Sequence, residues 1–118
     1  SANRQEQASG EAEDFFFVKT DYKLQRVNFD EVLYIEGLKD YVSIYTQKER
    51  IITLQLMKKL EEFLPSERFM RVHRSYIIAL DKIDKVEKGR IHIQDKIIPI
   101  GDTYRESFSL KKSFNPHI

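Results

Sequence analysis

The stretch RFMRVHRSYIIAL (residues 68–80) has the most informative pattern in this sequence. It places a cluster of polar and amphipathic side chains between the apolar runs FM and YIIAL, and the cluster consists of Arg71, His73, Arg74, Ser75 and Tyr76. Polar groups between two buried segments indicate a turn or strand end that projects them from a rigid base. Arginine can form two hydrogen bonds with guanine O6 and N7, and histidine, serine and tyrosine can reach phosphates or base edges. The same composition also fits an ordinary solvated loop, with His73 packed and Arg74 paired with an acid.

Short runs rich in β-branched and aromatic residues lie on both sides of this stretch. They predict strands in VLYIEG (Val32–Gly37), YVSIYT (Tyr41–Thr46), RIHIQ (Arg90–Gln94) and KIIPIG (Lys96–Gly101). A polar break suited to a hairpin turn separates the last two runs, and Lys88-Gly89 supplies another turn. Ordered structure is expected to begin at FFFVKT (Phe15–Thr20), the first apolar run of the chain.

Two segments have the pattern of helices instead. In TLQLMKKLEEFLP (Thr53–Pro65) apolar residues recur every three and four positions, which forms one apolar stripe, and Thr53 is the expected N-cap. The segment Asp102–Lys112 is expected to form a terminal helix with Asp102 as its N-cap. The sequence therefore predicts a mostly β fold of antiparallel strands with one internal helix and one C-terminal helix.

Composition divides the chain into a short tail and one domain. Residues 1–14 contain no aromatic or β-branched residue, so we expect a disordered linker or tag remnant there and a single domain over residues 15–118. The whole chain has 20 Lys and Arg residues against 19 Asp and Glu residues, a net charge of +1. The tail holds one of the bases and four of the acids, which leaves a net charge of +4 from Phe15 onward. This mild basic excess is compatible with a DNA-binding face.

Several function classes find no support in the sequence. The chain has no cysteine for disulfides or thiolate metal sites, and His73, His92 and His117 lack the spacing of a zinc site. No glycine-rich phosphate loop or nucleophile motif is present. We therefore expect no catalytic residue, no metal and no cofactor. No apolar run approaches the roughly 20 residues of a membrane helix, and no signal peptide is recognisable, so a cytoplasmic location without a membrane segment is expected.

Two functions remain open for a β-rich domain of this kind. The polar cluster in residues 68–80 has suitable chemistry for DNA binding, but its composition alone does not decide for it. The small net charge favours a protein–protein interaction module that uses exposed aromatic residues and sheet edges. Salt-dependent and sequence-selective affinity for DNA would distinguish the first function from the second.

Four blocks of the sequence together resemble the LytTR (LytR/AlgR-type) DNA-binding domain, which lies at the C-terminus of many bacterial response regulators. The blocks are VLYIEGLKDYVSIYT (Val32–Thr46), TLQLMKKLEEFLP (Thr53–Pro65), FMRVHRSYIIALDKIDKV (Phe69–Val86) and RIHIQDKIIPIGDTYRESF (Arg90–Phe108). They follow the family's order and spacing. The most specific parts are the FxRxHRSY core and the pattern I-P-x-small-x-x-Tyr over Ile98–Tyr104 near the end.

The resemblance implies both a fold and a function. The expected fold is elongated, with small antiparallel sheets and no helix-turn-helix. The expected function is sequence-specific binding of double-stranded promoter DNA, as the output domain of a transcriptional response regulator in a two-component system. Loop and strand-end residues would read the major groove, and two copies would bind paired sites as a dimer. The N-terminal receiver domain of such regulators is absent from this sequence.

The resemblance also implies three DNA-contacting places. The residues it implicates are Lys39, Tyr41, Arg71, His73, Arg74, Ser75, Thr103, Tyr104 and Arg105. It assigns base-edge readout to Arg74, and a phosphate contact or a supporting hydrogen bond to His73. Lys39 is expected to meet phosphate. Tyr41 either touches the DNA or packs in the core.

This chain departs from the family's usual residues at two points. Relatives often have serine and arginine where Gly101, Asp102 and Thr103 stand here, and a carboxylate near phosphate is repulsive. The third contact is therefore expected to be weaker, or to be carried by Arg105. Ala79 also stands where relatives often have asparagine.

Overall fold

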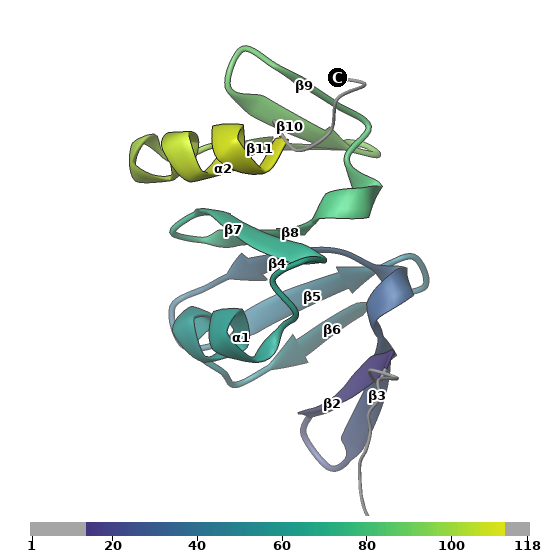
Figure 1. Ribbon diagram of the computed structural model, residues 1–118. Helices are drawn as coiled ribbons and strands as arrows, with labels where there is room; N and C mark the ends of the chain where they lie inside the picture. Colours follow the sequence, from purple (N-terminus) through teal and green to yellow (C-terminus); the bar gives the residue numbers. More distant parts are fainter. Residues whose placement is uncertain (1–13, 113–118) are drawn as a thin grey trace, which may run out of the picture.

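The structure is a computed structural model that describes residues 14–112, and the disorder predicted for the tail lies outside them except at Asp14. The chain folds into three small antiparallel sheets and two α-helices (Figure 1). The central sheet has five strands in the order β6-β5-β4-β8-β7, a ribbon pairs β2 with β3, and the last sheet has the order β11-β10-β9. The mostly β architecture with an internal and a C-terminal helix is confirmed.

The strands and helices have the following bounds. The first half contains β2 (Phe15–Lys19), β3 (Leu24–Asn28), β4 (Val32–Gly37), β5 (Val42–Thr46), β6 (Arg50–Thr53) and α1 (Met57–Phe63). The second half contains β7 (Phe69–His73), β8 (Tyr76–Ala79), β9 (Lys85–Glu87), β10 (Arg90–Ile93), β11 (Lys96–Pro99) and α2 (Arg105–Lys112). Short 3-10 turns cover Phe29–Glu31, Leu80–Lys82 and Asp102–Tyr104.

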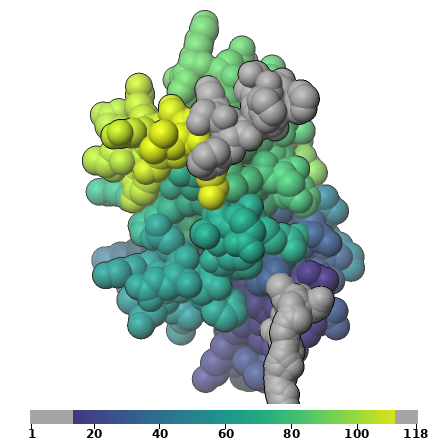
Figure 2. All heavy atoms as spheres, in the orientation of Figure 1, coloured from purple at the N-terminus to yellow at the C-terminus, as the bar shows by residue number. Residues whose placement is uncertain are grey.

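The five-stranded sheet separates two hydrophobic cores. One core fills the space between this sheet, α1 and the β2–β3 ribbon, and the other lies between the sheet, β9–β11 and α2. Strand β8 shows how the sheet serves both, because Ile77 packs in the first core and Ile78 in the second. Space-filling atoms on one face show α2, in yellow, against the teal α1–β7 region (Figure 2). Period-two alternation in a strand covered on both faces explains why these runs are apolar throughout.

A register shift in β4 departs from strict alternation. Val32 and Ile35 belong to the first core, whereas the two residues between them, Leu33 and Tyr34, both belong to the second. The pairing of β4 with β5 is irregular between Val32 and Tyr34, which places consecutive side chains on one face. This shift brings the Tyr34 ring to the three-stranded sheet.

The predicted helix over Thr53–Pro65 is wrong at its start. Thr53 ends strand β6 and is buried, and its Oγ1 donates a hydrogen bond of 2.6 Å to the Lys19 carbonyl of β2. The helix begins only at Met57, after an N-cap at Leu56 that provides no side-chain hydrogen bond. Pairing of β6 with β5 holds the chain extended through Thr53, so tertiary contacts outweigh the local helical pattern.

The N-cap predicted at Asp102 is also wrong. A short 3-10 turn over Asp102–Tyr104 precedes α2, Gly101 occupies the cap position, and no side chain caps the turn. The Asp102 carboxylate lies instead 3.4 Å from Nε of Arg105. Among residues 14–112, no helix has the length and apolar character that a membrane span requires.

The two predicted turns of the three-stranded sheet are confirmed. Lys88 and Gly89 connect β9 to β10 with φ of 53° and 73°, the left-handed backbone that tight hairpin turns demand. Gln94, with φ of 52°, begins the turn between β10 and β11. These tight hairpins keep the sheet small.

We predict a large loss of stability when the centre of the sheet is truncated. Ile35 is fully buried between Ile44 and Ile77, so Ile35→Ala should lower the free energy of unfolding by about 2–5 kcal/mol. The matched control is Ile52→Ala, because Ile52 on edge strand β6 is 47% exposed and its truncation should cost less than about 1 kcal/mol. Urea denaturation measures both values, and equal losses would contradict the placement of the core.

Candidate nucleic-acid interface

The polar cluster of residues 71–76 forms the end of the β7–β8 hairpin. Strand β7 ends at His73, Arg74 and Ser75 form a two-residue turn, and β8 starts at Tyr76, which pairs with His73. The register shifts between Arg71 and His73, just before the turn. The expectation of a turn or strand end on a rigid base is therefore confirmed.

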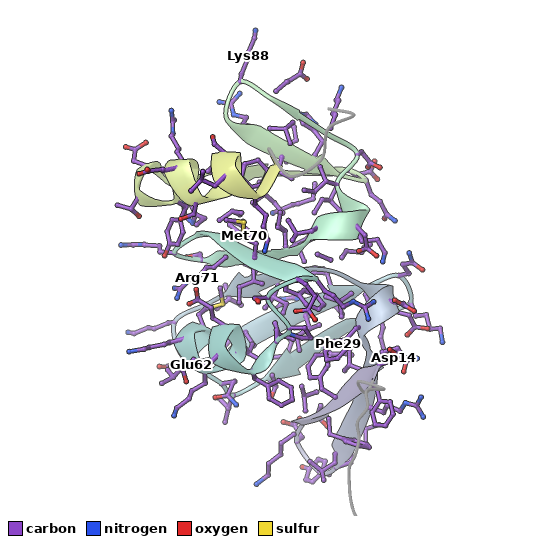
Figure 3. The ribbon with its side chains drawn as sticks, in the orientation of Figure 1. Asp14, Phe29, Glu62, Met70, Arg71 and Lys88 are labelled. Atoms are coloured by element: carbon purple, nitrogen blue, oxygen red, sulfur yellow. The ribbon has the colours of Figure 1, made fainter. Side chains whose placement is uncertain are left out.

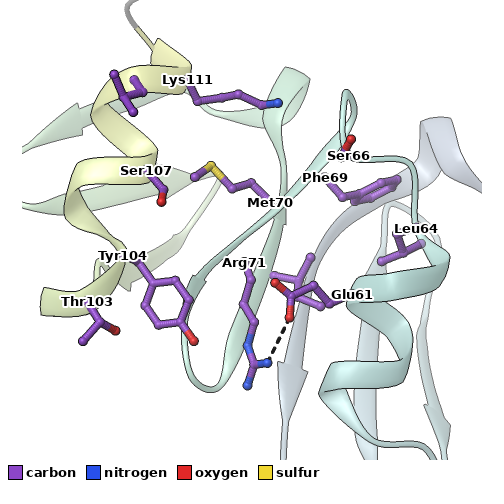
Figure 4. Close-up of a pocket in the computed structure, with 12 residues that line it drawn as sticks. Glu61, Leu64, Ser66, Phe69, Met70, Arg71, Thr103, Tyr104, Ser107 and Lys111 are labelled. Carbon is purple, nitrogen blue, oxygen red and sulfur yellow. Dashed lines mark hydrogen bonds and ion pairs between the residues drawn. The ribbon is translucent and has the colours of Figure 1, made fainter.

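Arg71 points into the protein and holds the turn. Its Nη1 lies 3.2 Å from Oε1 of Glu61 on α1, an ion pair that Figure 4 shows as a dashed line. Its Nε and Nη2 donate hydrogen bonds to the carbonyls of His73 and Arg74. Met70, its neighbour, points to the opposite side, toward α2 (Figure 3). All three nitrogens of the Arg71 guanidinium thus have partners within the protein.

His73 is half-buried, and its Nε2 forms no hydrogen bond with any residue of the described range 14–112. Its Nδ1 accepts a 3.0 Å hydrogen bond from the backbone N–H of Ser75, which closes the turn. Because Nδ1 is an acceptor, the neutral ring carries its proton on Nε2. The ring also packs against Tyr76, with 5.6 Å between the ring centroids. His73 can therefore support the turn with one nitrogen and donate a hydrogen bond with the other.

Arg74 lies at the tip of the turn and is exposed. Its carbonyl accepts the bond from Arg71, but its guanidinium forms no hydrogen bond or ion pair with any residue of the described range 14–112. Among the described residues, no acid neutralises Arg74. The Arg74 guanidinium is free to form two hydrogen bonds with an external acceptor.

The loop between β4 and β5 lies beside this turn. The N–H of Gly37, the last residue of β4, donates a 2.8 Å hydrogen bond to the carbonyl of Ser75. The loop is closed by a second bond of 2.8 Å, from the N–H of Leu38 to the carbonyl of Tyr41. Lys39 is exposed and Tyr41 is 38% exposed, so Tyr41 does not pack in the core. Both side chains are accessible on a loop that is bonded to the β7–β8 turn.

The third segment, Gly101–Arg105, is attached to the other side of the hairpin. The Gly101 N–H donates a 2.8 Å hydrogen bond to the carbonyl of Val72 in β7. A Cβ at Gly101 would lie only 3.6 Å from Cα of His73, so the two backbones approach closely here. Tyr104 packs against the second core, whereas Thr103 and Arg105 are exposed. The ion pair with Asp102 partly neutralises Arg105.

The three predicted segments therefore meet at one end of the molecule. Backbone hydrogen bonds from Gly37 to Ser75 and from Gly101 to Val72 join the β4–β5 loop, the β7–β8 turn and the start of α2. All three lie on the left in Figure 1. The exposed side chains that share this end are Lys39, Tyr41, Arg74, Thr103 and Arg105. Arg71, Ser75 and Tyr104 lie behind them in contact with the protein.

Sequence reasoning missed the residues that hold this arrangement. Glu61 of α1 pairs with Arg71, a contact that the helical pattern of its own segment does not indicate. Gly37 and Gly101 carry the backbone bonds between segments, and a Cβ at either would crowd a neighbour. No local pattern signals these roles because each partner comes from a different element. Within residues 14–112, no group of His, Asp and Glu side chains is arranged to hold a metal ion.

Comparisons with known proteins identify the family of the chain. The sequence model of the LytTr DNA-binding domain matches residues 22–113. Two curated relatives, both named sensory transduction protein LytT, come from Bacillus cereus and Bacillus anthracis, and each is 29% identical over 92 residues. The match covers 73% of this chain but 37% of each relative, so the chain spans little more than a third of their length.

A solved structure supports the fold. A LytTr DNA-binding domain from Bacillus cereus matches with a TM-score of 0.73 at 19% sequence identity, covering 86% of this chain and 98% of that chain. The matching family is one of DNA-binding domains. From the matched range of its sequence and from its fold, this chain belongs to the LytTr DNA-binding domain family.

Proposed function

We propose that this chain binds double-stranded promoter DNA sequence-specifically, as the output domain of a bacterial transcriptional response regulator. The observation that carries the proposal is the convergence of the β4–β5 loop, the β7–β8 turn and the start of α2 at one end. At that end Lys39 and Arg74 are exposed, and neither side chain has a partner among residues 14–112. Unpaired cations on a rigid base suit a polyanion such as DNA.

We assign base readout to the turn. A major groove about 12 Å wide admits a two-stranded β-ribbon, and the β7–β8 turn consists of only two residues. Arg74 at its tip would form a bidentate contact with a guanine, and the Nε2 of His73 would donate to a phosphate or base edge. Arg71 and Ser75 would fix the turn from within, through the bonds to Glu61 and His73.

The flanking segments would set the position of the domain on the duplex. Lys39 is suited to a phosphate contact, and Tyr41 to a contact with the DNA backbone or a base. Thr103 and Arg105 would reach phosphates on the other side, with the charge of Arg105 weakened by Asp102. Contacts of this kind fix register and carry little sequence information.

The setting in a longer regulator is part of the proposal. The LytT relatives extend well beyond the matched region, which is consistent with a receiver domain N-terminal to this one. Two copies of the domain would bind paired sites about one helical turn apart. The location is then cytoplasmic, where promoter DNA resides.

Selection of duplexes from a random DNA pool at near-physiological salt tests the proposal, with Arg74→Ala beside the wild type. We expect the wild type to enrich a short motif. The variant should lose about 1–3 kcal/mol of affinity for it and relax its preference at one base pair. The matched control is Arg26→Ala in β3, an exposed arginine on the β2–β3 ribbon, whose removal should change neither quantity.

An unchanged motif and affinity in Arg74→Ala would contradict the assignment of base readout. If the wild type enriches nothing, the selection is repeated with two tethered domains, because single half-sites can bind weakly. If the tethered domains also enrich no duplex, the protein–protein interaction module is favoured instead.

Removal of Lys39 should weaken DNA binding without changing its selectivity. Lys39→Ala is expected to lower affinity similarly for preferred and unrelated duplexes, and to reduce the slope of log K against log salt by about one. Lys48→Ala is the matched control, because Lys48 lies in the β5–β6 turn at the other end of the strands. Titrations between low and moderate salt measure both slopes, and equal changes in the two variants would contradict a specific phosphate contact.

A further inference from the structure

The ammonium group of Lys96 lies among aromatic rings at the seam between two sheets. Lys96 begins β11 of the three-stranded sheet, and its Nζ is 5.3 Å from the ring centroid of Tyr76 and 5.8 Å from that of Tyr34. Tyr34 stacks on Tyr45 with 4.5 Å between the ring centroids. The three tyrosines come from β4, β5 and β8 of the five-stranded sheet. They provide ring faces that attract a cation.

A carboxylate completes this cluster. Glu36 of β4 accepts hydrogen bonds from the hydroxyl groups of Tyr76, at 3.3 Å, and Tyr45, at 3.5 Å. Burial alone would lower the pKa of Lys96, but a hydrogen bond with Tyr76 and the nearby charges outweigh it and raise this pKa above its ordinary value. Burial raises the pKa of the Tyr34 phenol, which the charge of Lys96 opposes. At neutral pH Lys96 is therefore a cation beside the neutral phenol of Tyr34.

The cluster adjoins the segments that meet at the interface. Tyr76 directly follows the Arg74-Ser75 turn, and it pairs across the strands with Glu36. Gly37 comes next in β4, and its N–H bonds to the Ser75 carbonyl. At the other side, β11 runs from Lys96 toward Gly101, where the third segment starts. Lys96 therefore connects the three-stranded sheet, whose strand β11 leads to the Gly101–Arg105 segment, with strands β4 and β8. These two strands adjoin the β4–β5 loop and the β7–β8 turn.

We propose that Lys96 is a positioning residue for DNA reading, which acts through Tyr76 and Glu36 on the turn and the loop. This inference rests on the proposed function. Lys96 would set how the turn and the loop sit relative to the third segment, without touching the DNA itself. A phosphate contact is the competing role for this lysine, and it has different consequences. It would affect all duplexes alike and would contribute about one unit to the salt slope.

A measurement without DNA tests the positioning role directly. Amide hydrogen exchange at Gly37, followed by NMR, reports on the bond between the loop and the turn. Lys96→Met keeps the aliphatic stem and removes the charge, and we expect exchange at Gly37 to become about five- to tenfold faster. Lys85→Met is the matched control: Lys85 lies on β9 of the same sheet and contacts Glu87, and its removal should leave the exchange rate unchanged.

Lys96→Arg should restore the wild-type rate, because a guanidinium also binds over aromatic rings. Unchanged exchange at Gly37 in Lys96→Met would overturn the proposal. If Lys96→Met does not fold, Tyr76→Phe decides the question. This variant keeps the ring and removes the hydroxyl that bonds to Glu36, and it should speed exchange at Gly37 by a smaller factor. An unchanged rate there overturns the proposal equally.

Binding measurements separate this proposal from the proposed function. On the duplex that the wild type selects, Lys96→Met should bind about five- to tenfold more weakly, while binding to unrelated DNA and the salt slope stay within error. Equal weakening on all duplexes, with the salt slope reduced by about one, would identify Lys96 as a phosphate contact. This result would overturn the inference about Lys96 and leave the proposed function unaffected. A wild-type chain that selects no duplex would instead contradict the proposed function, and the exchange rates would still show whether Lys96 holds the turn.

Discussion

The burial of the five-stranded sheet on both faces is the constraint on which this structure depends. Its inner strands send side chains alternately into two separate cores, as Ile77 and Ile78 do in β8. A one-residue slip of such a strand would exchange the side chains of the two cores, so the register is strongly specified. The ends of β4 and β8 are therefore fixed in space. The packing of the two cores therefore sets the positions of the β4–β5 loop and the β7–β8 turn, which adjoin these ends.

This constraint separates the side chains that hold the interface from those available to a ligand. Arg71 is bound to Glu61 and to turn carbonyls, whereas Arg74, three residues later, projects from the turn without a partner among residues 14–112. The chain needs no strong overall charge for this arrangement, and its net charge is only +1. A small net charge gives little long-range steering, so selectivity would depend on a few donors held in fixed positions.

Much of the fold could be predicted from the sequence, because buried strands leave a strong pattern of β-branched residues. The strand β3 escaped prediction since Val27 is its only buried residue, and β6 was partly assigned to a helix because Thr53 looked like an N-cap. For the site, the polar cluster and the family resemblance identified the segments that the structure brings together. Their partners, such as Glu61 and Lys96, could not be found because their roles arise from contacts between elements distant in the sequence.

The central claim is that three separate segments form one DNA-reading surface. An NMR titration of the isotope-labelled chain with its selected duplex tests this most directly. The account predicts that amides in residues 38–41, 73–75 and 103–105 shift together at the same ratio of DNA to protein, while those of the β2–β3 ribbon stay in place. Shifts confined to the ribbon, or to only one of the three segments, would contradict it.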